Sequence, residues 1–102
     1  MKKIAIFVEG QTELITVREF LLREFDYTVK IECRTLFKPG KFNKAPYDYN
    51  SSDAEFHFQI VNVGNDTAVL QRILEREKHM WNSGYEKIIG LRDMYSQIYG
   101  EE

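Results

Sequence analysis

Lys3-Ile4-Ala5-Ile6-Phe7-Val8-Glu9-Gly10 is the stretch that decides the fold. Five apolar residues follow one another without a polar interruption, and the run ends at a carboxylate and a glycine. A strand buried on both faces of a parallel sheet has this pattern, because neither of its faces meets water. The stretch therefore predicts a first strand, over residues 3–8, in the interior of a parallel sheet.

Two amphipathic helices are predicted from apolar residues at helical spacing. The first runs from Gln11 to about Phe25 and has its stripe at Leu14, Val17, Leu21 and Phe25, widened by Ile15 and Leu22. The second begins after Gly64-Asn65-Asp66, ends before Gly84, and has its stripe at Leu70, Ile73, Leu74 and Trp81. Asn65 or Asp66 is a suitable N-cap, and Gly84 is a suitable C-terminal stop.

Three further strands are predicted. Val29, Ile31 and Cys33 alternate with Lys30, Glu32 and Arg34, which indicates a strand with one wetter face near an edge of the sheet. The other two strands are predicted over Glu55–Val63 and over Lys87–Leu91. Phe37–Ala54 contains both prolines and shows no periodicity, so we expect a long loop there.

The predicted order of these elements alternates strands with helices along the chain. This alternation is typical of an α/β domain with about four mostly parallel strands and helices on both faces. The 102 residues fit a single domain, residues 1–102. In such open sheets ligands bind where strands end and helices begin.

Composition narrows the class of protein. Hydrophobic residues make up 43% and charged residues 29%, which suits a folded globular chain. No apolar run approaches the roughly 20 residues of a membrane helix, so we expect no membrane association and a cytoplasmic location. Cys33 is the only cysteine, so we expect it to be a small buried residue. The formal charge of −2 gives no overall attraction to nucleic acid.

Two predicted strands end in a carboxylate, the first at Glu9 and the last at Asp93. On neighbouring strands the two could share one divalent ion, because Mg²⁺ is bound by one or two carboxylates together with waters and phosphate oxygens. Gly10 leaves room for a ligand, and the helix starting near Thr12 offers free backbone N–H groups to a phosphate. The sequence therefore predicts a site for Mg²⁺, or Mn²⁺, and a phosphate.

Ile6-Phe7-Val8-Glu9-Gly10-Gln11-Thr12-Glu13 resembles the opening motif of Toprim domains, the fold shared by topoisomerases, bacterial primases and OLD-type nucleases. It looks most like small bacterial Toprim-like proteins of unknown function. The strand ending at Gly90-Leu91-Arg92-Asp93 is similar in place to the second acidic motif of that family. The resemblance covers essentially the whole chain and implies a nuclease or a related phosphodiester enzyme.

The resemblance implies particular roles. Glu9 would be the general acid/base or a metal ligand, and Asp93 the first aspartate of an Asp-x-Asp metal motif. This sequence departs from that motif, because Tyr95 and Leu91 stand two residues to either side of Asp93. The chain also ends at Glu102, where a further helix would be starting, so we expect a domain truncated at its C-terminus.

Several other residues are candidates for the same site, each with a simpler alternative. Glu13 is a possible outer metal ligand, although any carboxylate is stabilised in the first turn of a helix. Arg92 is suited to a phosphate or to pairing with Asp93, or is a solvated surface residue. Lys41 and Lys44 lie in the long loop among aromatic residues, a combination that binds nucleic-acid backbone and bases but also occurs in ordinary surface loops.

Three hypotheses of function follow. The first is a Mg²⁺-dependent nuclease acting on DNA or RNA. The second is a catalytically inactive Toprim-like module, which binds or regulates within a homo-oligomer or with another protein. The third is a receiver-like phosphoacceptor domain, but the chain lacks the lysine and threonine pattern expected at its strand ends.

Overall fold

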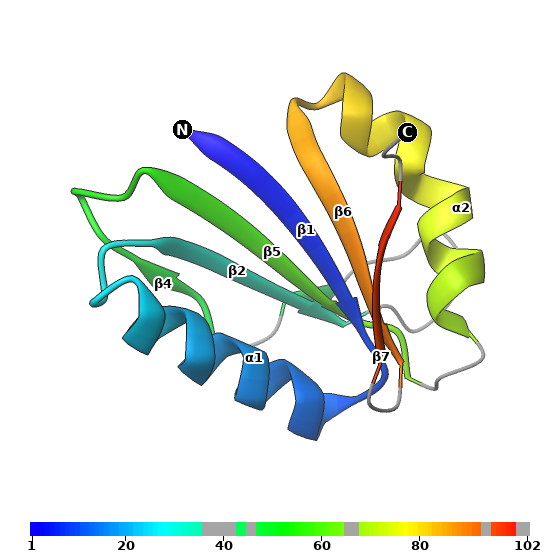
Figure 1. Ribbon diagram of the computed structural model, residues 1–102, viewed down its shortest axis with the longest axis horizontal. Coiled ribbons are helices and arrows are strands. Elements are labelled where there is room, and N and C mark those ends of the chain that lie inside the picture. Colours follow the sequence, from blue (N-terminus) through cyan, green and yellow to red (C-terminus); the bar gives the residue numbers. More distant parts are fainter. Residues whose placement is uncertain (36–42, 45–46, 65–67, 93–94, 100–102) are drawn as a thin grey trace.

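The chain forms one mixed sheet flanked by two helices over the residues that the computed structural model describes, which are 1–35, 43–44, 47–64, 68–92 and 95–99 (Figure 1). The long strands are β1 (Lys2–Val8), β2 (Lys30–Thr35), β5 (Phe56–Asn62) and β6 (Tyr85–Arg92). The helices are α1 (Gln11–Glu24) and α2 (Ala68–Asn82). The prediction of a mostly parallel α/β sheet is confirmed.

The four long strands run parallel, in the spatial order β2-β5-β1-β6. Ile6 in β1 lies opposite Ile60 in β5 and Ile89 in β6, so the interior strand predicted from the opening stretch has an apolar neighbour on each side. Parallel pairing brings the carboxyl ends of all four strands to one edge of the sheet. That edge is where Glu9 follows β1.

Three short strands extend the sheet antiparallel to its outer strands. β3 (Asn43–Lys44) and β4 (Tyr49–Asn50) pair with β2, and β7 (Tyr95–Tyr99) pairs with β6. The prediction that Phe37–Ala54 is wholly loop is therefore wrong, and the helix expected to start at Glu102 lies outside the described residues. The physical reason is that β2 and β6 end the parallel set, and their outer backbone groups need hydrogen-bond partners.

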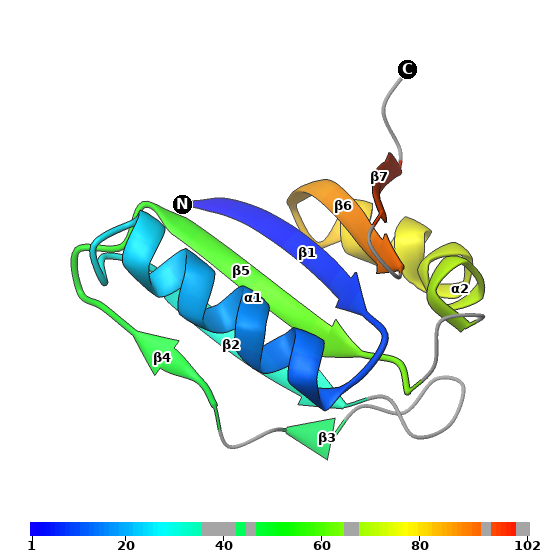
Figure 2. The same cartoon turned by 60° about the horizontal axis from the view of Figure 1, so that its bottom comes forward.

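The two helices cover opposite faces of the sheet, as predicted (Figure 2). The alternation along β1 shows this, because Ile6 and Val8 pack in the α1 cluster whereas Ala5 and Phe7 pack in the α2 cluster. Phe7 is completely buried. Each such side chain contributes about 1.5–3 kcal/mol through burial, so the sheet interior holds both layers together.

The predicted stripe of α1 is correct in its main members, whereas that of α2 is correct at Ile73 and Trp81 and wrong at Leu74, and the side chain of Leu70 lies outside the described part of the chain. Leu14, Leu21 and Leu22 of α1 are buried, but Ile15 is 38% exposed. In α2, Ile73 is buried together with Met80, which the prediction missed, whereas Leu74 is 61% exposed. Ile15 directly follows the buried Leu14, and Leu74 directly follows the buried Ile73, so each lies about 100° further around its helix and away from the sheet.

Gly84 ends α2 as predicted. Its φ angle is +91°, which favours glycine, and its N–H donates to the Trp81 carbonyl at 3.1 Å. No helix within the described ranges is both long and apolar enough to span a membrane.

Candidate functional site

The turn between β1 and α1 consists of only Glu9 and Gly10. Glu9 is partly buried, and Gly10 is the N-cap of α1 with an extended backbone and no side-chain hydrogen bond to the helix end. The Gly10 carbonyl accepts the first helical bond from Leu14 N at 3.0 Å. The first-turn N–H groups of a helix lack intrahelical acceptors, so this turn combines a carboxylate with donors for an anion.

Glu13 folds back over Gly10. Its Oε1 lies 3.1 Å from the position that a Cβ on residue 10 would occupy, so any side chain there would press on the Glu13 carboxylate. A larger residue here would therefore require the exposed Glu13 side chain to shift by a few tenths of an ångström. Glu9 and Glu13 therefore belong to one turn, where the helix dipole also favours the negative charge of Glu13.

Asn62 is a site residue that the sequence reasoning missed. It is the last residue of β5, is only 8% exposed, and lies opposite Val8 in β1. Its Nδ2 donates to Gln11 Oε1 at 3.4 Å, and its Oδ1 accepts from Gly64 N at 2.9 Å. Asn62 thus links the turn after β5 to the first residue of α1. Its signal was a strand-end polar residue close to a glycine, the same pattern as Glu9-Gly10.

The turns after β1 and β5 diverge across the sheet. From β1 the chain passes through α1 on one face to β2, whereas from β5 it passes through α2 on the other face to β6 (Figure 1). β1 and β5 are neighbours, so this is the point where the direction of the crossovers reverses. Ligands of open α/β sheets bind in the crevice at such a point.

The other predicted residues fall in different places. Arg92 ends β6, the neighbour of β1, so its backbone lies at the same edge as Glu9. Thr12 is exposed in the first turn of α1. Lys44 lies in β3, which β2 and β5 separate from β1, a spacing of about 14 Å. Asp93 and Lys41 lie outside the described residues.

The described residues contain no group of three or more His, Cys, Asp or Glu side chains that could hold a metal ion. At the turn after β1 they offer two carboxylates, Glu9 and Glu13. Hard oxygen donors of this kind suit Mg²⁺, which takes one or two carboxylates and completes its shell with waters or phosphate oxygens.

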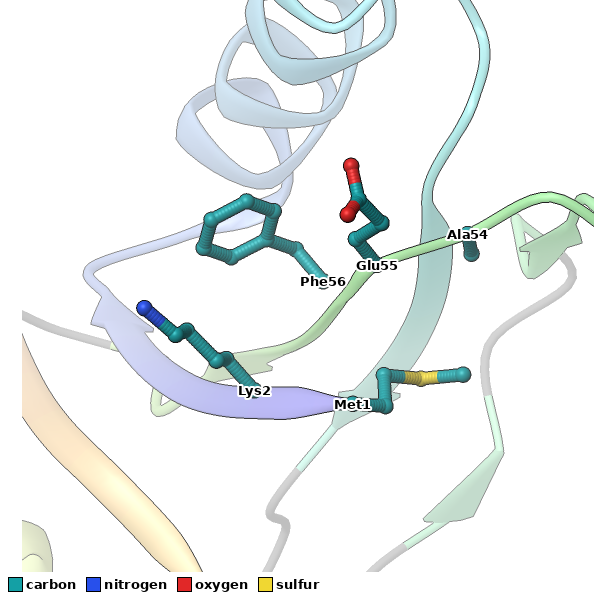
Figure 3. A pocket seen from close by; sticks show the side chains of 5 residues that line it. All are labelled: Met1, Lys2, Ala54, Glu55 and Phe56. Carbon is teal, nitrogen blue, oxygen red and sulfur yellow. The ribbon is translucent and has the colours of Figure 1, made fainter.

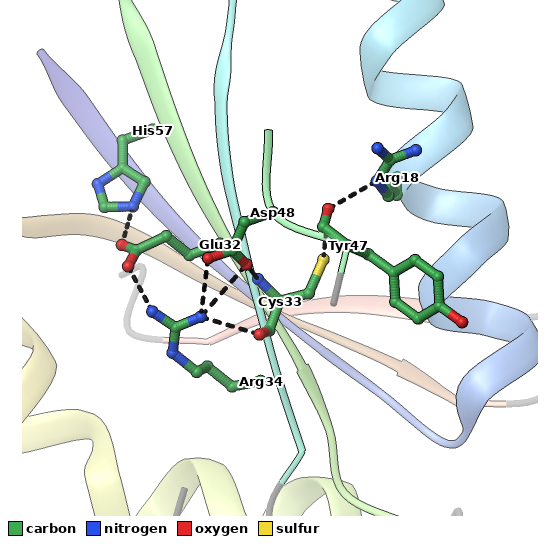
Figure 4. Close-up of polar contacts among 7 residues, drawn as sticks. All are labelled: Arg18, Glu32, Cys33, Arg34, Tyr47, Asp48 and His57. Carbon is green, nitrogen blue, oxygen red and sulfur yellow. Dashed lines mark hydrogen bonds and ion pairs between the residues drawn. The ribbon is translucent and has the colours of Figure 1, made fainter. Parts of the chain in front are cut away.

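A second polar cluster lies on the opposite side of β2 from α1 (Figure 4). Glu32 contacts His57 Nε2 through Oε1 and accepts from Arg34 Nη2 through Oε2 at 2.6 Å. Arg34 also pairs with Asp48 at 3.3 Å, and Asp48 Oδ1 accepts from Cys33 N at 2.7 Å. These bonds attach the segment before β4 to β2, which is a structural role.

Two buried groups of this region have shifted pKa values. Desolvation lowers the pKa of His57 below its ordinary value, although the Glu32 carboxylate opposes this. Cys33 is fully buried as predicted, and burial, with the nearby Asp48 charge, raises its pKa to about 11. The thiol is therefore protonated and unreactive at neutral pH.

A cavity of about 370 Å³ lies at the amino ends of β1 and β5, lined by Met1, Lys2, Ala54, Glu55 and Phe56 (Figure 3). Lys2 reaches over the Phe56 ring, with Nζ 6.0 Å from its centroid. The cavity is at the opposite end of these strands from Glu9 and Asn62. Its position does not match the edge at which this type of sheet binds ligands, so we assign the candidate site to the turn after β1.

A scan against protein-family models finds no match to the chain, and searches of curated proteins and of solved structures find no significant similarity.

Proposed function

We propose that the chain is a Toprim-like, Mg²⁺-dependent domain that cleaves nucleic-acid phosphodiesters. One observation carries the proposal: β6 runs parallel beside β1, so the two strands that precede Glu9 and Asp93 in the sequence are adjacent and end at the same edge. We propose that Asp93 continues from β6 to lie beside Glu9, where the two carboxylates would repel each other unless a cation lies between them. The resemblance to Toprim domains assigns the same two residues, Glu9 through the Glu-Gly-x-Thr-Glu motif and Asp93 through the later acidic motif.

The residues at and near the turn after β1 have separate proposed roles. Glu9 and Asp93, with Glu13 as an outer ligand, would hold Mg²⁺ or Mn²⁺, which supplies charge neutralisation at the phosphate and activation of a water. The N–H groups at the start of α1 would orient a phosphate oxygen, with Gly10 allowing close approach. Asn62 supports the turn through Gln11. Arg92, Lys41 and Lys44 are the cationic candidates for neighbouring phosphates of DNA or RNA.

The proposed reaction is the hydrolysis of a phosphodiester bond by water. Water attacks phosphorus while a base accepts its proton, the bond from phosphorus to the leaving oxygen breaks, and that oxygen receives a proton from an acid. Glu9 is the candidate for this acid/base role because it is carried directly by a strand of the sheet interior.

The test is Glu9→Gln, with Glu24→Gln as its control. Glu24 is an exposed glutamate at the other end of α1, so its replacement makes the same charge change far from the turn. In an Mn²⁺ titration followed by NMR, we expect broadening of amides around Glu9 and Gly10 that Glu9→Gln abolishes and Glu24→Gln retains. Cleavage of labelled DNA and RNA with Mg²⁺ should fall by about 10²–10⁴-fold in Glu9→Gln alone.

Stability serves as the internal check. The free energy of unfolding of both variants should lie within about 0.5 kcal/mol of that of the parent, because neither side chain, one after a strand and one at a helix end, belongs to the core. Full cleavage by a folded Glu9→Gln protein would exclude the catalytic role of Glu9.

The second candidate is a catalytically inactive Toprim-like module that acts in a homo-oligomer or with a protein partner. The sequence favours it at one point: Leu91 and Tyr95 flank Asp93 where the family motif has a second aspartate. Localised Mn²⁺ broadening without cleavage of either nucleic acid would favour this candidate over the nuclease.

A further inference from the structure

A second cavity, of about 280 Å³, lies between α2 and the sheet. The residues that line it come from the start of β1, the middle of β5, the second half of α2, the turn after α2 and the start of β6: Lys3, Gln59, Arg76, His79, Met80, Ser83 and Tyr85. Lys3 lies near the start of β1 and Glu9 directly after its end, six residues later, so the backbone at Lys3 is about 20 Å from the candidate active site. The two sites share no residue.

The lining is cationic. Lys3 approaches from the sheet and Arg76 from the helix, and the imidazole of His79 lines the cavity beside them. Among the described residues that line the cavity, none is acidic. Burial lowers the pKa of Arg76, with Glu75 opposing the shift, which indicates that water only partly reaches the guanidinium. Two cations directed at one small space favour an anion there.

The position of Lys3 is well defined. Its Nζ donates to the Ser83 carbonyl at 2.8 Å and lies 4.6 Å from the centroid of the Tyr85 ring. An ammonium group has three N–H donors, so this bond leaves others for a ligand. Burial, together with the Glu32 charge, raises the pKa of Tyr85 to about 12, so its hydroxyl stays protonated even well above neutral pH. The wall beside Lys3 is thus neutral and able to donate.

We propose that this cavity binds a single phosphate group, held by Arg76 and Lys3. Arginine matches phosphate with two parallel N–H donors, and lysine adds a point charge. The volume is just below the range of about 300–1,000 Å³ typical of sites for larger ligands, which suits one phosphate rather than a dinucleotide. The phosphate belongs either to a small phosphate monoester or free phosphate, or to the 5′ end of a nucleic-acid strand. The inference stands independently of the proposed nuclease activity.

The test is a titration of the whole ¹⁵N-labelled chain with inorganic phosphate, at constant ionic strength set with chloride. We expect saturable shifts of the amides of Gln59, Ser83, Gly84 and Tyr85. Arg76→Gln should weaken binding by about tenfold or more, and Arg76→Lys should restore part of the loss. Lys78→Gln, an exposed position on the same helix outside the cavity, should leave the affinity unchanged.

The absence of saturable shifts at these amides, or equal effects of Arg76→Gln and Lys78→Gln, would overturn the proposal. If Arg76→Gln fails to fold, Lys3→Gln is measured by the same shifts and decides in its place. Adenosine monophosphate and a short oligonucleotide, with and without a 5′ phosphate, then separate the two sources. Tighter binding of the phosphorylated oligonucleotide than of the mononucleotide assigns the strand end, whereas equal or weaker binding assigns the small phosphate.

Discussion

The two faces of the sheet differ most clearly along β2. Ile31 and Cys33 point toward α1 and are completely buried, whereas Glu32 and Arg34, on the other face, keep 25% and 18% of their side chains exposed. The paths of the helices explain the difference. α1 leads to β2 and packs over both β5 and β2, whereas α2 leads to β6 and packs over β6 and β1 (Figure 2).

The two faces of β2 show that the alternation of apolar and charged residues along a strand indicates which of its faces a helix covers. Where a helix lies above, a strand face is apolar, and where none lies above, it carries charges that pair with one another. On the charged face of β2, Glu32 forms ion pairs with both His57 and Arg34 (Figure 4). The same face becomes apolar at Val61 and Phe7, next to Ile73 of α2.

The largest expected effect on stability is at Ile31, on the face of β2 that α1 covers. We call this the covered face, and we call the opposite face, which carries Lys30, Glu32 and Arg34, the open face. Ile31→Ala removes a fully buried side chain and should lower the free energy of unfolding by about 2–5 kcal/mol. Lys30→Ala, one residue earlier on the open face, should change it by less than about 0.5 kcal/mol. Urea denaturation of both variants measures the contrast directly. Similar losses from the two would show that the faces are not divided as described.

The next effect concerns the ion pairs on the open face. Glu32→Gln keeps the shape of the side chain but removes the charge that joins His57 to Arg34. The cluster is partly exposed, so its loss should cost about 1–2 kcal/mol, between the values for surface and for buried pairs. Arg34 retains Asp48 in this variant. A double-mutant cycle with His57→Gln isolates the Glu32–His57 coupling, and additive losses would show that the two residues do not interact energetically.

Much of this two-faced arrangement could be predicted from the sequence. The alternation from Val29 to Arg34 assigned the buried and wetter faces of β2 correctly, because period-two patterning directly reflects burial. The short strands β3, β4 and β7 could not be predicted. β3 and β4 have two residues each and therefore carry no periodicity, and all three strands form because the outer edges of β2 and β6 need partners.

Of the candidate site, the sequence predicted the turn at Glu9 and Gly10 but not the contribution of Asn62. Glu9 and Gly10 stand directly after an unmistakable strand, so their place at the carboxyl edge follows from the sequence. Asn62 did not stand out, because its importance depends on β5 being the neighbour of β1, and sequence order does not reveal spatial order. The joint role of Glu9 and Asp93 stays a prediction, since Asp93 lies outside the described residues.

The smallest expected effect is the pH dependence that His57 adds on the open face. Its pKa is lowered in the folded chain, so the unfolded chain binds the proton more tightly. The free energy of unfolding should therefore be highest above the ordinary histidine pKa of about 6.5 and fall as the pH drops from there toward the lowered value. The effect is modest because Glu32 opposes the desolvation that causes it. Denaturation at about pH 7.5 and about pH 5.5 should show a smaller difference for His57→Gln than for the parent, with His79→Gln, at an exposed position on α2, as control. A pH dependence that His57→Gln leaves unchanged would mean that other groups titrate there, and that the open face is too well hydrated to penalise the charge of His57.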